Sequence, residues 1–114
     1  MTTKAKIITP SEALKGWVNL NKEIRYKNCF AAKQFTAGLI AFRPHKAARP
    51  RQINHEDKDV VCQVLEGYGQ LRIHQRRRQL RPGMICHIPK KTPHDFAAGT
   101  KGDLVLFYSL IKTG

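Results

Sequence analysis

Cysteine, histidine and arginine are the residue types through which this sequence could do chemistry. The chain has three cysteines among 114 residues, Cys29, Cys62 and Cys86, and none of them belongs to a Cys-x-x-Cys pair. An odd number of widely spaced cysteines argues against a disulfide framework, and the missing pair excludes a zinc knuckle and a thioredoxin-type redox site. Cys62 and Cys86 stand inside apolar stretches, where a cysteine packs like a small hydrophobic residue. We therefore expect all three to be structural thiols.

No arrangement of residues in the sequence predicts nucleophilic catalysis. Ser11 and Ser109 have no motif around them, and there is no glycine-rich phosphate loop. Cys86 is followed directly by His87, but neighbouring residues of a strand point to opposite faces of its sheet. These two residues are therefore not expected to form a catalytic pair.

The sequence is strongly basic, with 21 lysines and arginines against 8 acidic residues and a net charge of +13. An excess of this size suggests an anionic partner, or a solubility trait with no dedicated partner. Arginines gather at residues 72–81 and at residues 43–51. Neither cluster interleaves aromatic side chains or lies on a helix that would enter a groove, so nucleic-acid binding is disfavoured. An anionic small molecule is the simpler partner, because arginine contacts a carboxylate or phosphate through two hydrogen bonds.

Short strand patterns fill most of the chain and must position these residues. Thr9-Pro10, with a glutamate at residue 12, predicts a short helix from residue 10 to about residue 15. Apolar strand patterns follow at residues 36–42, 60–65, 70–74, 79–81, 84–88 and 103–111. Gln75–Arg78 are expected at a hairpin tip, and residues 43–58 in a proline-bearing loop. Short, evenly spaced strands with turn residues between them indicate an all-β sandwich or barrel.

Two stretches of the sequence resemble the motifs of the cupin superfamily, in particular of its small single-domain members. Residues 59–69, Asp-Val-Val-Cys-Gln-Val-Leu-Glu-Gly-Tyr-Gly, match the second half of the first motif. Residues 83–94, Gly-Met-Ile-Cys-His-Ile-Pro-Lys-Lys-Thr-Pro-His, match the spacing of the second motif, with Lys91 where the family has glycine. The resemblance covers residues 42–110.

This resemblance implies an all-β fold, a double-stranded β-helix or cupin jelly-roll barrel, with a short N-terminal helix. We expect one domain over residues 1–114. Residues 1–35 would form an N-terminal extension and the first strands, and residues 36–111 the conserved barrel.

The resemblance also implies a set of metal ligands, which this chain keeps in part. Cupins hold a divalent metal with two histidines and an acidic residue from the first motif and one histidine from the second. His94 stands at the second-motif position and Asp59 at the acidic position. His55 suits the second histidine of the first motif, whereas Ile53 replaces the first. These three ligands would suit iron, manganese, nickel, zinc or copper, with His45 as a substitute from the loop.

Two alternatives stay open from the sequence alone. Aligning Phe42-Arg-Pro44 with the Phe-x-Pro start of the family's preceding strand puts Arg51 and Ile53 at the two histidine positions and leaves His55 in a loop. The barrel would then lack part of the metal set. In the second alternative the barrel holds no metal at all, and His94 only lines the pocket.

The function expected from these observations is small-molecule binding in the barrel. Arg49 and Arg51, at the barrel mouth, would bind an anionic ligand, and His87 would line the pocket. The chain would be either a metal-dependent enzyme of dioxygenase or isomerase type, or a non-enzymatic ligand-binding or sensor barrel without metal. We expect a homodimer that pairs through its sheets. The sequence shows no apolar run near the ~20 residues of a membrane helix and no signal-peptide core, so we expect a cytoplasmic protein.

Overall fold

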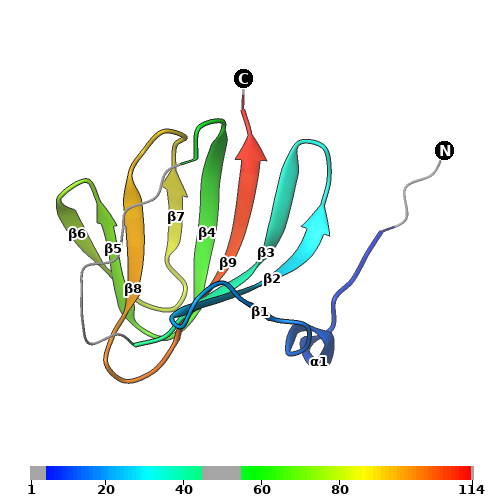
Figure 1. Ribbon diagram of the computed structural model, residues 1–114, viewed down its shortest axis with the longest axis horizontal. Helices are drawn as coiled ribbons and strands as arrows, with labels where there is room; N and C mark the ends of the chain where they lie inside the picture. The colour runs from blue at the N-terminus through cyan, green and yellow to red at the C-terminus, as the bar shows by residue number, and fades with distance from the viewer. Residues whose placement is uncertain (1–4, 45–54, 114) are drawn as a thin grey trace.

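The computed structural model of the protein describes residues 5–44 and 55–113. Within these residues the chain forms one helical turn and nine strands, which Figure 1 shows in chain order. The helix is α1 (Pro10–Ala13), and the strands are β1 (Val18–Asn19), β2 (Ile24–Ala31), β3 (Phe35–Phe42), β4 (Lys58–Glu66), β5 (Gly69–Ile73), β6 (Arg76–Leu80), β7 (Ile85–Ile88), β8 (His94–Ala98) and β9 (Leu104–Lys112).

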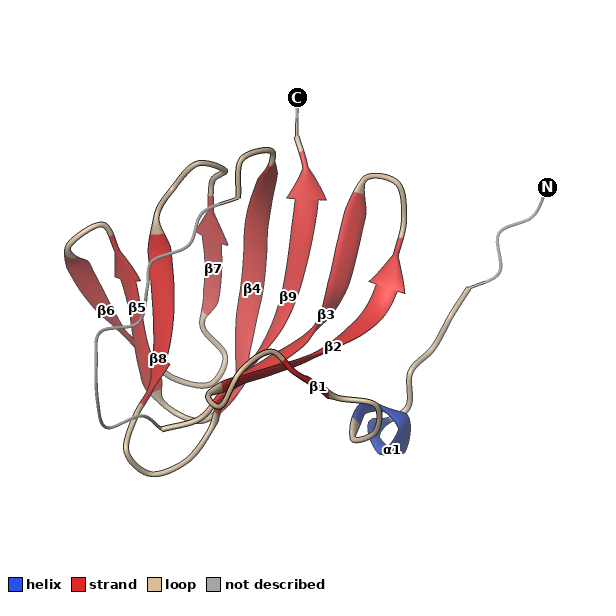
Figure 2. Ribbon diagram, in the orientation of Figure 1, coloured by secondary structure: helices blue, strands red, loops and turns tan. Residues whose placement is uncertain are grey.

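The strands form two antiparallel sheets. The large sheet has the strand order β1-β2-β3-β9-β4-β7, and the small sheet has the order β6-β5-β8. The last strand, β9, pairs with β3 on one side and β4 on the other, so residues far apart in the sequence meet at the centre of the large sheet. Figure 2 shows α1 next to β1, outside the two sheets. This architecture agrees with the jelly roll expected from the sequence.

The short helix α1 follows its sequence signal closely. The Thr9 hydroxyl accepts a hydrogen bond from the Glu12 amide, and the Glu12 carboxylate accepts one from the Thr9 amide, which is a complete capping box. The helix ends at Ala13, earlier than the sequence predicted. No helix in residues 5–44 and 55–113 has the length and apolar character that a membrane span requires.

The core lies between the two sheets and is built from alternating strand residues. Along β4, Val60, Cys62 and Val64 are buried, because every second side chain of a strand points to the same face. The rest of the core cluster consists of Phe42, Leu71, Leu80, Ile88, Leu104 and Leu106. Each fully buried aliphatic side chain of this kind contributes roughly 1.5–3 kcal/mol to folding.

The outer face of the large sheet is partly apolar. Gln63 of β4 lies between Ile85 of β7 and Phe107 of β9, and these two side chains are 72% and 36% exposed. The sequence predicted a homodimer that pairs through its sheets. This stays a prediction, and the partly apolar outer face would be its interface.

The structure corrects the sequence prediction for the arginine hairpin. The turn is made by His74 and Gln75, with His74 in the left-handed conformation at φ 56°. Arg76–Arg78 are therefore strand residues of β6 rather than the hairpin tip, and Arg76 is the register partner of Ile73. Arginine carries no strong turn preference, so the two-residue turn is decided by strand pairing.

A strand that the sequence analysis did not predict, β8, completes the small sheet. Its sequence, His-Asp-Phe-Ala-Ala, contains no β-branched residue and gives little strand signal. It forms by pairing along its whole length with β5. On the outer face of this pair, Nε and Nη2 of Arg72 donate hydrogen bonds to Oδ2 of Asp95 over 2.9 and 2.7 Å. This ion pair ties the two strands together.

Candidate functional site

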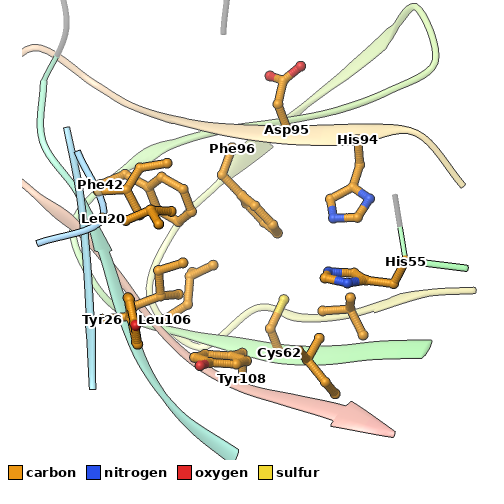
Figure 3. A pocket seen from close by; sticks show the side chains of 14 residues that line it. Leu20, Tyr26, Phe42, His55, Cys62, His94, Asp95, Phe96, Leu106 and Tyr108 are labelled. Atoms are coloured by element: carbon orange, nitrogen blue, oxygen red, sulfur yellow. The ribbon is translucent and has the colours of Figure 1, made fainter. Parts of the chain in front are cut away.

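A cavity of about 290 Å³ lies between the two sheets. Its wall is mostly aliphatic and aromatic, with side chains such as Phe42, Leu106 and Phe96, and Figure 3 shows them around the space. Tyr26 and Tyr108 add phenol rings to the wall. Burial raises the pKa of Tyr108, whose hydroxyl donates a hydrogen bond to Oδ1 of Asn28 over 3.1 Å. The sequence analysis did not identify this apolar wall, although the alternation of apolar residues along residues 104–110 was a usable signal.

Two histidines are brought together at one end of the cavity. His94 begins β8 and is 3% exposed, and His55 precedes β4. Their ring centroids are 6.1 Å apart, and Figure 3 shows both rings directed into the cavity. The structure thus pairs two of the residues that the sequence analysis proposed as metal ligands.

Backbone contacts hold both histidines in place and set the tautomer of the His94 ring. Nδ1 of His94 lies 2.8 Å from the carbonyl oxygen of Thr92. A carbonyl only accepts, so Nδ1 carries the hydrogen and Nε2 of the neutral ring keeps its lone pair. The carbonyl of His55 accepts a hydrogen bond from the Lys91 amide over 2.7 Å, which ties His55 to the loop between β7 and β8.

The environment of His55 disfavours its charged form. Burial lowers the pKa of His55 most, and repulsion from His94 and Lys58 lowers it further, against a smaller opposite effect of Asp57. The ring is therefore neutral near pH 7. A neutral imidazole can accept a hydrogen bond or bind a metal.

Asp59 and His87 lie on the other side of the large sheet. The Asp59 carboxylate accepts hydrogen bonds from Nε2 of His87 over 2.8 Å and from the Lys90 amide over 2.9 Å. These bonds, that of His87 first, lower the pKa of Asp59. The reason for this placement is strand alternation, since Val60 next to Asp59 faces the core. Contrary to the expectation from the sequence, the structure brings neither residue to the cavity.

The remaining predicted site residues, His45, Arg49 and Arg51, lie outside the described residues, as does Ile53. Among the residues that are described, no three His, Cys, Asp or Glu side chains come close enough to hold a metal ion. The cavity offers the imidazoles of His55 and His94, and the nearby Asp95 carboxylate points away from it toward Arg72 (Figure 3). Two imidazoles alone do not complete the coordination of a divalent metal, so the described part of the site does not fit a metal by itself. Metal binding at His55 and His94 stays a prediction that requires a further ligand.

The fold and the cavity between the sheets define a small jelly-roll barrel that can hold a ligand. The family model described as cupin domain matches residues 38–110, well over half of the chain. The chain therefore belongs to the cupin family, and the resemblance seen in the two motifs is confirmed.

Solved structures agree on the fold. KdgF from Halomonas sp. superposes with a TM-score of 0.79 at 19% identity, with 96% of each chain covered. An RmlC-like cupin from Shewanella frigidimarina gives a TM-score of 0.71 at 14% identity over 86% of this chain and 84% of that one. A structure of Fe(II)-HppE with the alternative substrate (S)-1-HPP gives 0.77 at 14% identity, over 94% of this chain and 60% of that one. No curated protein sequence matches the chain. At these identities the likeness establishes the jelly roll, and the fold prediction is confirmed.

Lys91 is strained in a way that the family's glycine at this position would not be. Its φ is +65°, in the left-handed region that costs a residue with a side chain about 1–2 kcal/mol. We expect Lys91→Gly to raise the free energy of unfolding by up to about 1 kcal/mol, because glycine's greater freedom in the unfolded chain offsets part of the relief. Urea unfolding measures this change. The matched control Lys101→Gly, in another exposed loop, should lower stability, and equal losses in both variants would contradict the assignment of strain.

His55 gives the site a defined response to acid. Because its pKa in the folded chain lies below 6.5, the unfolded chain binds a proton at this position more readily. The stabilising contribution of neutral His55 is therefore complete above about pH 6.5 and is lost as the pH falls toward its folded pKa. In an NMR titration we expect His55 to titrate below 6.5. His94→Gln should move its pKa part of the way back, because the burial remains, and a His55 that titrates above 6.5 would contradict this account of the site.

Proposed function

We propose that the chain binds a small organic molecule in the cavity between the sheets, with an apolar body and one hydrogen-bond donor. The observation that carries the proposal is the fixed imidazole of His94 at one end of an apolar cavity. Its Nδ1 is occupied by the Thr92 carbonyl, so Nε2 is the acceptor left for a ligand. Nearby side chains such as Phe96 and Leu106 would take up the apolar body.

The size of the cavity limits the ligand. About 290 Å³ stands at the lower end of the range of roughly 300–1,000 Å³ typical of ligand pockets. A compact molecule of one ring therefore fits better than a nucleotide or a lipid. The anionic ligand expected from the sequence depends on Arg49 and Arg51, which lie outside the described residues. Binding of an anionic ligand is therefore tested separately, with a carboxylate compound in the titration below.

We further propose that this binding does not need a metal. The described wall supplies His55 and His94, whereas the Asp59 carboxylate is engaged by His87 and Lys90 on the outer face. The alternative is a metal-dependent enzyme, which would need at least one more ligand beside the two imidazoles, such as the His45 predicted from the sequence. The iron of the HppE structure belongs to that protein.

A matched pair of ligands tests the hydrogen bond at His94. We expect p-cresol to bind about five- to tenfold more tightly than toluene, because one hydrogen bond contributes about 1 kcal/mol. Protein NMR titrations measure both affinities. His94→Phe keeps a ring in place but removes the acceptor, and it should bring the ratio close to one. His87→Phe, the same change on the outer face, should leave the ratio unchanged.

The outcomes of this titration separate the ligand classes. If neither compound binds at millimolar concentration, or if His94→Phe leaves the ratio unchanged, the proposed binding mode is wrong. Tighter binding of 4-methylbenzoate than of p-cresol would favour the anionic ligand predicted from the arginines.

Elemental analysis tests whether a metal is involved. We expect tag-free protein purified without a chelator to carry only substoichiometric metal, and the affinity for p-cresol to be the same with and without EDTA. The physical reason is the incomplete ligand set of the described cavity. About one metal ion per chain, lost in His94→Ala, would contradict this expectation and favour the metal-dependent enzyme.

A further inference from the structure

A second cavity, of about 730 Å³, is lined by residues of β5, β6 and β7. Its wall combines residues of the small sheet, of the segment that leads into β7 and of β7 itself, among them Leu71, Arg78, Leu80, Arg81, Met84 and Cys86. The proposed ligand-binding function does not use this space. Cys86, half-buried at its wall, is a nucleophilic group without a role in the site described above.

Cys86 has a second cysteine directly opposite it. In the antiparallel pair of β4 and β7, Cys62 and Cys86 are register partners, so both side chains lie on the same face of the sheet. Directly opposed residues in such a pair have Cα atoms ~4.5–5.5 Å apart, which lies inside the range of ~4.4–6.8 Å found for disulfides. The strand pairing thus gives the two cysteines a backbone spacing that is compatible with a disulfide.

The two cysteines differ in exposure and in acidity. Cys62 is 2% exposed, whereas Cys86 can be reached from the second cavity. The neighbouring Cys62 thiol lowers the pKa of Cys86 to about 7, whereas the Cys86 thiol and burial raise the pKa of Cys62. The other titratable or charged side chains in the wall around Cys86 are Tyr68, Arg78 and Arg81. The two guanidinium groups favour an anion in this cavity.

We propose that Cys86 and Cys62 form a peroxide-reactive thiol pair, in which Cys86 is the attacking sulfur and Cys62 the resolving sulfur. The Cys86 thiolate attacks one oxygen of hydrogen peroxide, the O–O bond breaks, and the departing hydroxide takes up a proton to leave as water. Cys86 is then a sulfenic acid. The Cys62 sulfur attacks the Cys86 sulfur, the S–O bond breaks, and a second water leaves with the Cys62 proton. Two thiols lose two electrons and two protons, and one peroxide becomes two waters.

Oxidation of the thiol pair would affect the ligand cavity through the side chain of Cys62. Cys62 lines the cavity that holds His55 and His94, as Figure 3 shows, while its partner lines the second cavity. Formation of the disulfide, which begins at Cys86 in the second cavity, would therefore change the wall of the ligand cavity at Cys62.

Mass spectrometry of the full chain tests the pair. After one equivalent of hydrogen peroxide, we expect the intact mass to fall by two hydrogens. Trypsin should then yield the peptide of residues 59–72, with Cys62, linked to the peptide of residues 79–90, with Cys86, and the link should disappear on reduction. Cys29, on the peptide of residues 28–33, is the internal control and should stay free. Thiols that remain reduced, oxygen adducts without a link, or a link through Cys29 would each overturn the proposal.

The pH dependence of the reaction tests the role of Cys62. The rate should rise with pH as the thiolate forms, with a midpoint near pH 7 rather than near the value of ~8.5 for an ordinary thiol. Cys62→Ser keeps a donor to Cys86 and should keep this midpoint, whereas Cys62→Ala should move it upward by about one unit. Both variants should accumulate a sulfenic acid that dimedone traps. Equal midpoints in Cys62→Ser and Cys62→Ala, with circular dichroism showing both folded, would overturn the assigned role.

Discussion

The ion pair between Arg72 and Asp95 is the constraint on which the candidate site depends. It lies on the outer face of the small sheet, with both side chains largely shielded from solvent. Because side chains alternate along a strand, a carboxylate held outside at residue 95 directs His94 and Phe96 inside. The strand that carries them has little strand preference of its own, so its pairing with β5 decides which side chains face the cavity. Loss of one partner would leave a charge in a poorly solvated position beside the ligand site.

The same alternation places the side chains of the first cupin motif, residues 59–69, on both faces of β4. Cys62 faces the core, and Asp59 faces outward, where it contacts His87, Lys90 and Thr113. Asp59 still serves the site indirectly. Its carboxylate accepts a hydrogen bond from the amide of Lys90. The amide of the next residue, Lys91, donates to the carbonyl of His55, and this bond anchors the histidine at the cavity. The carboxylate that the sequence predicted to be a metal ligand thus supports, in the structure, the loop behind His55.

Local signals in the sequence predicted the architecture well and the site in part. The two motifs and the short apolar strands were sufficient for the jelly roll, because each rests on residues close together in the chain. Non-local pairing decided the rest. The strand at residues 94–98 depends on β5, the face of Asp59 depends on the register of β4, and the contact of Cys62 with Cys86 joins residues that no spacing rule connects. A shift of one residue in register would exchange the faces of a whole strand, and a single sequence does not reveal that register.

The arginines of β6 give the positive charge a role in the folded chain that requires no ligand. This strand is an edge of the small sheet, and Arg76, Arg77 and Arg78 are all exposed on it. An exposed edge presents unpaired backbone groups to which a strand of another molecule can add, and natural sheets block such growth with charged edge residues. If two copies approached each other at this edge, the three arginines of one copy would face the three arginines of the other. This repulsion would keep the barrels apart in dilute buffer. Salt would screen it, so self-association through this edge would increase with ionic strength.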